Sequence, residues 1–293
     1  FAIGAILIPA LIKHGYPTAY AAALQASSVD LGVIIPPSIP MILYGVSAEV
    51  SIGELFVAGI GPGLFVAGVL MVFVWAWCRW KGYGANDREG RLPVLRATRD
   101  AALALFMPVI ILGGILSGAF TATESASIAV AWAVLVTAIV YRSMSWHNFL
   151  KACAKACKTT GVVLLLIGIS AAFGYFMALY EVPQKTGELM QSVSSSPWVI
   201  FLMINVLLFV LGTFLDMAAT ILICTPIFLP IAMQFGMDPV QFGIVMLINC
   251  ALGLNTPPVG SVQFVGCAIG GVSVGEVMKS IWPFYGALGL CLL

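Results

Sequence analysis

The chain has 293 residues, of which 61% are hydrophobic and only 9% are charged, and its formal net charge is +1. A soluble domain is nearer half apolar and a quarter charged, so this composition excludes an ordinary soluble protein. It predicts an all-α polytopic protein that spans a lipid bilayer. The sequence has no basic patch interleaved with aromatic residues, so nothing in it points to a nucleic-acid partner.

The first segment, residues 1–54, contains an interrupted helix. Pro36 and Pro37 stand inside an apolar run, where two prolines cannot continue a helix. Gly32, just before them, tolerates unusual backbone angles. Irregular backbone persists inside a membrane only where it lines a cavity or meets a ligand. The polar residues around this break are therefore candidate ligands: Ser27, Ser28, Asp30 and Ser38.

Residues 55–158 are predicted to form scaffold helices, with spans near 55–78, 101–118 and 125–141. Lysine and arginine concentrate at 79–99 and 142–158, which places both stretches on the cytoplasmic side.

Two local patterns lie within this region. Residues 145–158 are amphipathic and basic, so we expect an arm helix along the inner membrane surface, or else a partner-binding helix. Thr121 and Glu124 fit a capping box that opens the next helix, and we prefer this structural role to one in transport.

After a span at 159–180, residues 197–233 form two apolar arms around a polar cluster at 212–216. The arms are short for full spans, so they predict a re-entrant hairpin. Two full spans with Asp216 in a loop are the alternative. An ionisable residue inside the membrane indicates a functional site. Asp216 is also suited to cap the following helix.

A second interrupted helix is predicted at 239–270, where Pro257 and Pro258 follow Gly253, Asn255 and Thr256. It belongs with the hairpin to a second unit, residues 159–275. Residues 276–293 are predicted to be a terminal scaffold helix.

The two interrupted helices belong to an internal repeat with an offset of 221 residues. Pro36 matches Pro257, because 257 − 36 = 221. Further matched pairs are Pro9 with Pro230, Gly15 with Gly236, Leu31 with Leu252, and Pro62 with Pro283, while Ser51 matches Ser273 at 222. The distribution of basic residues makes the two copies inverted, and inverted repeats with interrupted helices are typical of secondary transporters. The counterparts of residues 159–216 would precede residue 1, so we expect a longer protein whose first hairpin contributes only its second arm here.

Four stretches, residues 32–46, 114–127, 212–231 and 253–261, resemble the large permease subunit of tripartite ATP-independent periplasmic (TRAP) transporters. The resemblance implies an elevator-type fold like that of the ion transporter superfamily, in the bacterial inner membrane. It implies Na⁺-coupled uptake of an organic acid such as a C4-dicarboxylate or a sialic acid. The implied partners are a small four-helix membrane subunit and a soluble periplasmic binding protein. The chain departs from the family pattern at Asp30, Val33, Ala122 and Asn255.

The breaks and the resemblance together predict the binding residues. Unwound carbonyl groups and hydroxyl groups suit Na⁺. The predicted Na⁺ ligands are Gly212, Thr213, Leu215, Asp216, Gly253, Thr256, Pro257, Ser28, Gly32 and Pro36. The predicted substrate contacts are Asn255, Thr256, Ser38 and Asp30.

Three other functions are weighed against this one. A binding-protein-independent elevator transporter for dicarboxylate or citrate is the nearest. An intramembrane aspartyl hydrolase using Asp30 and Asp216 is remote, because these residues are not equivalent in the repeat and no Gly-x-Gly-Asp motif occurs. A purely structural subunit does not explain two interrupted helices. Because the transporter interpretation is preferred to the hydrolase, the chain is predicted not to be an enzyme.

Overall fold

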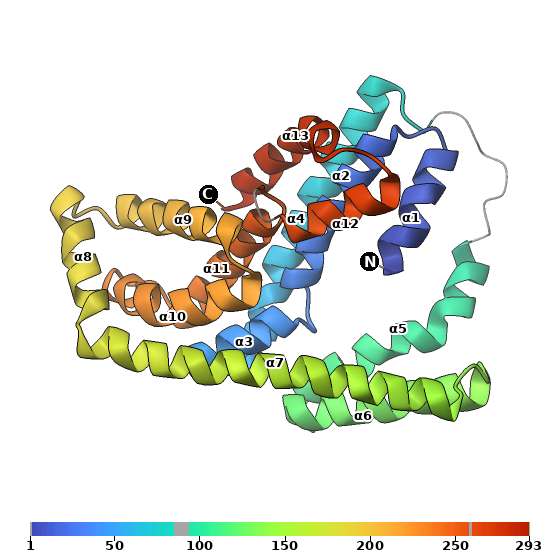
Figure 1. Cartoon of the computed structure of the whole chain (residues 1–293), viewed down its shortest axis with the longest axis horizontal. Coiled ribbons are helices and arrows are strands. Elements are labelled where there is room, and N and C mark those ends of the chain that lie inside the picture. Colours follow the sequence, from blue (N-terminus) through green and yellow to red (C-terminus); the bar gives the residue numbers. More distant parts are fainter. Residues whose placement is uncertain (1, 85–93, 258–259, 293) are drawn as a thin grey trace.

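The computed structural model describes residues 2–84, 94–257 and 260–292, and the regular elements of these residues are all helices (Figure 1). The prediction of an all-α polytopic membrane protein is confirmed. The helices are α1 (Ala2–Lys13), α2 (Thr18–Ile34), α3 (Ile39–Ala48), α4 (Ile52–Lys81), α5 (Val94–Leu116), α6 (Ala122–Leu135), the π-helix η1 (Val136–Val140), α7 (Trp146–Leu179), α8 (Val182–Val193), α9 (Pro197–Phe214), α10 (Met217–Gln234), α11 (Pro239–Leu254), α12 (Ser261–Gly270) and α13 (Val274–Leu292).

Five helical segments among the described residues are long and apolar enough to cross a membrane: α4, α6 with η1, α7, α9 and α10. The pair α2 and α3 passes the same test as a single span and is bent by 44° at its break. This bend confirms that the Pro36-Pro37 pair interrupts a helix. The second break lies between α11 and α12, where residues 258–259, including Pro258, are outside the described residues.

The internal repeat is visible in the bounds of the helices. Helix α1 ends at residue 13 and α10 at 234, and α2 begins at 18 and α11 at 239, which gives 221 in both cases. Helices α3 and α12 cover 39–48 and 261–270, an offset of 222 at both ends. The one-residue slip therefore lies in the breaks themselves. Gly15 and Gly236 both adopt the left-handed backbone conformation, with φ of 84° and 88°.

The contacts between these helices also follow the internal repeat. Helix α1 contacts α12 while its counterpart α10 contacts α3, and α2 contacts α13 while α11 contacts α4. Each of these contacts from the first copy to the second is thus matched by the equivalent contact from the second copy to the first. A two-fold relation between the copies requires such matched contacts. In Figure 1 the interrupted helices α2–α3 and α11–α12 occupy the middle of the molecule.

Helices α9 and α10 form the helix–turn–helix that was predicted at 197–233, with Leu215 and Asp216 between them. Each helix has 18 residues, which corresponds to about 27 Å, close to the ~30 Å hydrocarbon core of a bilayer. This length suits a re-entrant hairpin and a pair of full spans equally, so the re-entrant path stays a prediction.

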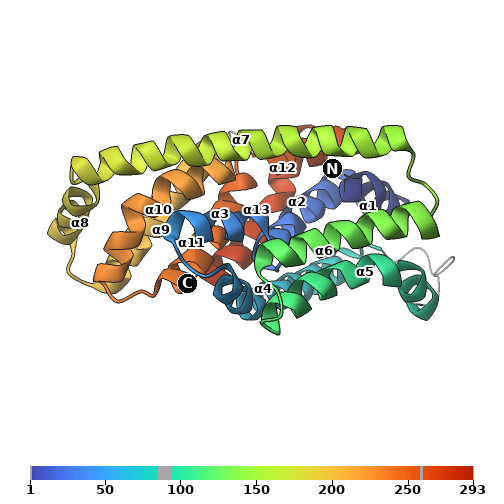
Figure 2. The same ribbon diagram turned by 90° about the horizontal axis from the view of Figure 1, so that it is seen from below.

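Helix α7 corrects one expectation. It runs unbroken for 34 residues, so the arm at 145–158 and the span at 159–180 are one helix (Figure 1). The segment contains no proline, and its single glycines do not break a helix that is otherwise continuous. The boundary predicted between residues 158 and 159 therefore falls inside a helix. Figure 2 shows α7 extending along one side of the molecule.

Helices α5 and α6 pack on each other, and the indole of Trp132 donates to the carbonyl oxygen of Leu103 at 3.1 Å. The capping box before α6 is confirmed. The backbone N–H of Thr121 donates to Glu124 at 2.8 Å, and the N–H of Glu124 donates to the Thr121 hydroxyl at 3.3 Å. Part of the predicted cytoplasmic basic stretch, residues 85–93, lies outside the described residues.

Candidate ion and substrate site

A hydrogen bond between side chains links the two interrupted helices. The amide nitrogen of Asn255, the first residue after α11, donates to a carboxylate oxygen of Asp30 in α2 at 2.7 Å. Asp30 is 2% exposed and Asn255 is fully buried. The structure therefore brings together two of the four predicted substrate contacts, and it places them inside the protein instead of on an open surface.

The backbone at the second break has a further partner, Tyr285 of α13. Its hydroxyl donates to the carbonyl oxygen of Asn255. The sequence carries no signal for Tyr285, because its counterpart in the first repeat, at 285 − 221 = 64, is the apolar Leu64. Gly63 of α4 nevertheless lies against the first break, where a Cβ atom would come within 2.8 Å of the Ile35 side chain. Helices α4 and α13, which are equivalent in the repeat, thus each contact one of the two breaks.

The tip of the α9–α10 hairpin meets the second break through two glycines. A Cβ atom built on Gly253 would lie 2.8 Å from the carbonyl carbon and 2.9 Å from the Cα atom of Gly212. Both residues are buried. Glycine is required here because the two backbones approach too closely for any side chain. Gly212 and Gly253, two of the predicted Na⁺ ligands, are therefore brought together at this crossing.

Gly32, the repeat counterpart of Gly253, has a different environment. It is exposed, and a Cβ atom built on it meets nothing within 4 Å among the described residues. Pro36, four residues later, is buried in the break.

Asp216 caps the helix that follows it. Its carboxylate accepts a hydrogen bond from the backbone N–H of Ala218 at 3.1 Å, and the side chain is exposed. The capping role is confirmed, and it leaves a second carboxylate oxygen for another ligand. Leu215, beside it, is half-buried, and its backbone N–H donates to the carbonyl oxygen of Leu211 at 2.9 Å.

The hydroxyl groups of the predicted site all donate to backbone carbonyl oxygens nearby. The donors and acceptors are Ser28 to Leu24 at 2.7 Å, Ser38 to Val33 at 2.5 Å, Thr213 to Val210 at 2.7 Å, and Thr256 to Leu252 at 2.8 Å. Ser38 also caps α3 by accepting from the N–H of Met41 at 3.5 Å. A hydroxyl oxygen that donates in this way keeps lone pairs for a cation.

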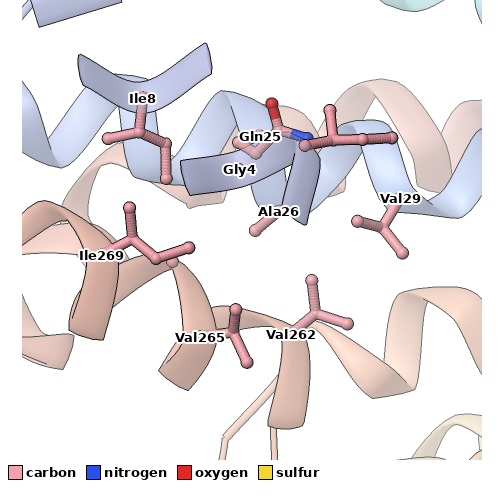
Figure 3. A pocket seen from close by; sticks show the side chains of 10 residues that line it. Gly4, Ile8, Gln25, Ala26, Val29, Val262, Val265 and Ile269 are labelled. Atoms are coloured by element: carbon pink, nitrogen blue, oxygen red, sulfur yellow. The ribbon is translucent and has the colours of Figure 1, made fainter. Parts of the chain in front are cut away.

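Two cavities lie close to these elements. One of about 740 Å³ lies between α9, α11 and α13, and Thr256, Pro257 and Tyr285 are among its lining residues. The other, of about 460 Å³, lies between α1, α2 and α12. Figure 3 shows Ile8, Val265 and other apolar side chains around this second cavity, with Gln25 as the polar side chain. No predicted binding residue lines the second cavity, so it is not the predicted site.

The donor set around the breaks is made of oxygen atoms. Within the part of the chain that the structure describes, no group of three or more His, Cys, Asp or Glu side chains is placed to hold a metal ion. Carbonyl, hydroxyl and carboxylate oxygens are hard donors, which suit hard cations and not soft ones.

Comparison with known proteins identifies the family. The family described as "Tripartite ATP-independent periplasmic transporter, DctM component" matches residues 1–293. The chain is 39% identical to the isethionate TRAP transporter permease protein DctMQ of Oleidesulfovibrio alaskensis over 293 residues, which are 100% of this chain and 46% of that protein.

Two further relatives carry other substrate names. The chain is 38% identical to the C4-dicarboxylate TRAP transporter large permease protein DctM of Pseudomonas aeruginosa, over 97% of this chain and 66% of the relative. It is 34% identical to the sialic acid TRAP transporter large permease protein SiaM of Vibrio cholerae, over 96% and 66%. The chain thus spans between about half and two thirds of the length of these three relatives.

These relatives are named as permease proteins, which confirms the prediction that the chain is not an enzyme. With its apolar spans, the chain is a multi-pass protein of the bacterial inner membrane. The match over all 293 residues agrees with the interrupted helices and the hairpin: the chain belongs to the DctM family of tripartite ATP-independent periplasmic (TRAP) transporter components.

Proposed function

We propose that the whole protein is the large permease subunit of a Na⁺-coupled importer of an organic acid anion. Family membership supports this proposal, and the relatives are named for isethionate, C4-dicarboxylate and sialic acid, which are all anionic. The partners are a small four-helix membrane subunit and a soluble periplasmic binding protein that delivers the substrate. The exact substrate is left open within this class.

The observation that carries the proposal is the meeting of irregular backbone from separate elements. The hairpin tip crosses the second break at Gly212 and Gly253, and the second break is tied to α2 through Asn255 and Asp30. Such backbone offers carbonyl oxygens to a cation, and the helix N-termini beyond the breaks favour an anionic group. Uptake of an anion together with Na⁺ uses both kinds of group.

In this proposal two groups of residues bind Na⁺, and a third group of residues contacts the substrate. The first Na⁺ region is the hairpin tip with the second break: Gly212, Thr213, Leu215, Asp216, Gly253, Thr256 and Pro257. The second Na⁺ region is the first break, with Ser28, Gly32 and Pro36. The substrate contacts are Ser38 and Thr256, while the other two residues that the sequence predicts as contacts, Asp30 and Asn255, are buried and bonded to each other.

Transport in this proposal follows an elevator mechanism. The two interrupted helices and the α9–α10 hairpin move as one body past a scaffold that contains the spans near residues 60–78 and 101–141. Contacts of α2 with α12 and of α3 with α10 link the two copies within this body. The two copies are inverted in the membrane, as the distribution of basic residues indicates.

The experiment that tests the proposal is uptake of labelled organic acids by proteoliposomes that contain the full-length permease and its small subunit. The panel includes a C4-dicarboxylate, a sialic acid and isethionate, each with and without the periplasmic binding protein. Uptake only when the matching binding protein is present supports the tripartite transporter. Equal uptake without it favours a binding-protein-independent elevator transporter instead.

A further inference from the structure

Three buried oxygen atoms near the first break have no hydrogen-bond partner among the described residues. They are the second carboxylate oxygen of Asp30, the side-chain oxygen of Asn255 and the hydroxyl oxygen of Ser27. Buried polar atoms in proteins are almost always paired, because an unpaired one loses its hydration without compensation. Three unpaired oxygens in one place therefore point to a ligand.

Asp30 links the three side chains, because it is bonded to Asn255 and shares a face of α2 with Ser27. The Asp30 carboxylate and the Asn255 amide are joined by the 2.7 Å hydrogen bond, so the free oxygen of each group lies next to that bond. Ser27 precedes Asp30 by three residues in α2, and residues spaced by three share a helix face. Three other buried atoms are unpaired among the described residues: the Ser125 hydroxyl of α6, the Asn249 oxygen of α11 and the Gln263 amide nitrogen of α12. The Gln263 nitrogen is a donor and cannot ligate a cation.

The ligand has to be as small as an ion. Ser27 is 1% exposed, Asp30 is 2% exposed and Asn255 is 0% exposed, and none of them lines either of the two cavities beside the breaks. An organic acid would have to displace packed helices to reach these oxygens. A substrate contact, which the sequence predicts for Asp30 and Asn255, is therefore a poorer explanation than an enclosed ion.

The charge balance selects a cation. Asp30 brings one carboxyl group, and a buried carboxyl group is either paired with a cation or neutralised by a proton. The basic residues described on the helices packed against α2 are exposed: Lys13 of α1, Arg79 and Lys81 of α4, and Lys279 of α13. None of them neutralises Asp30. Ca²⁺ takes six to eight oxygen ligands, commonly including several carboxylates, whereas this site offers only one.

We infer that Asp30, Asn255 and Ser27 bind a monovalent cation between the two interrupted helices. This site is separate from the crossing of Gly212 and Gly253, and its charge comes from a carboxylate and not from carbonyl dipoles alone. It goes beyond the proposed function, because a protein that transports nothing would still bind the ion. The bound cation would join α2 to the second break through ligands from both.

The test counts ions bound to the purified full-length protein, using equilibrium binding of radiolabelled Na⁺ with choline chloride to hold the ionic strength. The decisive variant is Asp30→Asn, which keeps the size of the side chain and an oxygen that accepts from Asn255, but removes the charge. We expect it to bind one Na⁺ fewer than the wild type. Ser27→Ala should keep the number of ions and weaken the last one roughly 10- to 100-fold, the range typical for lost groups around a metal.

The matched control is Asp238→Asn. Asp238 is an exposed carboxylate that caps α11 by accepting from the N–H of Val240 at 2.8 Å, and asparagine caps equally well. It should bind as many ions as the wild type. Thermal unfolding checks that each variant is folded.

An equal number of Na⁺ ions in Asp30→Asn and wild type would overturn the inference, whatever the transport assays show. The two proposals therefore fail separately. Absence of uptake under every gradient would count against the proposed function, while loss of one ion in Asp30→Asn would still establish this site.

Discussion

The side-chain amide of Asn255 lies 2.7 Å from the carboxylate of Asp30, although the two residues are 225 positions apart in the sequence. Each residue stands beside a helix break, and each departs from the pattern of the family that the chain resembles. The carboxylate of Asp30 accepts the hydrogen bond that the buried side-chain amide of Asn255 must donate. The bond fixes the two halves of the internal repeat to each other at the centre of the molecule.

The crossing of Gly212 and Gly253 gives the sharpest prediction about stability. A methyl group on Gly253 would lie 2.8 Å from the backbone of Gly212, so Gly253→Ala must separate the hairpin tip from the second break. We expect a loss of about 1–3 kcal/mol in the free energy of unfolding, typical of overpacking. The measurement is denaturant or thermal unfolding in detergent. Gly275→Ala is the matched control, since a Cβ atom there meets nothing within 4 Å. Equal stability of the two variants would contradict the close crossing.

Asp216 has two roles that different substitutions separate. Asp216→Ala removes the cap of α10 and should cost about 1 kcal/mol of stability, whereas Asp216→Asn keeps a capping oxygen and should cost little. Both variants lose the carboxylate, so both should show weaker stimulation of uptake by Na⁺. Uptake against Na⁺ concentration, measured beside thermal unfolding, checks both statements. Unchanged Na⁺ stimulation in Asp216→Asn would leave this residue with only its capping role.

Tyr285 supports the second break from α13. Replacement of Tyr285 by Phe leaves the carbonyl group of Asn255 without its donor and should lower the free energy of unfolding by about 1–3 kcal/mol. Tyr175→Phe is the control, because Tyr175 is 67% exposed on α7. Equal unfolding temperatures for the two variants would show that the hydrogen bond to Asn255 contributes nothing.

The capping box at Thr121 and Glu124 is assigned a structural role. Thr121→Ala should lower stability by about 0.5–2 kcal/mol, the usual cost of losing an N-cap, and should leave the apparent affinity for substrate unchanged. Thr123→Ala, at an exposed position in the same turn, should do neither. A change in substrate affinity without a change in stability would instead place Thr121 in the transport pathway.

The sequence predicts the positions of the breaks and the hairpin well, because proline, glycine and the repeat act locally. The 221-residue offset of Pro36 and Pro257 recurs in the bounds of α1, α2, α10 and α11. It does not predict the unbroken α7, because a change from basic to apolar composition near residue 158 resembles a boundary although nothing there stops a helix. Composition shows where a helix meets water, and only a proline or a cap shows where it ends.

The site is predicted less completely than the fold. Residue types identified Asp30 and Asn255 as unusual, but their hydrogen bond depends on how α2 packs against α11. Tyr285 carries no signal in the sequence, since its repeat counterpart, Leu64, has no polar group. Pairings between residues more than 200 positions apart are set by tertiary packing, which a single sequence does not encode in any local pattern.

The central claim, that these breaks couple an anion to Na⁺, is tested most directly by uptake driven by an imposed gradient. Proteoliposomes with the full-length permease, its small subunit and the binding protein would receive either an inward Na⁺ gradient or an equal K⁺ gradient. The account predicts accumulation of the organic acid with Na⁺ and none above equilibration with K⁺. Equal accumulation under both gradients, or accumulation with neither, would contradict it.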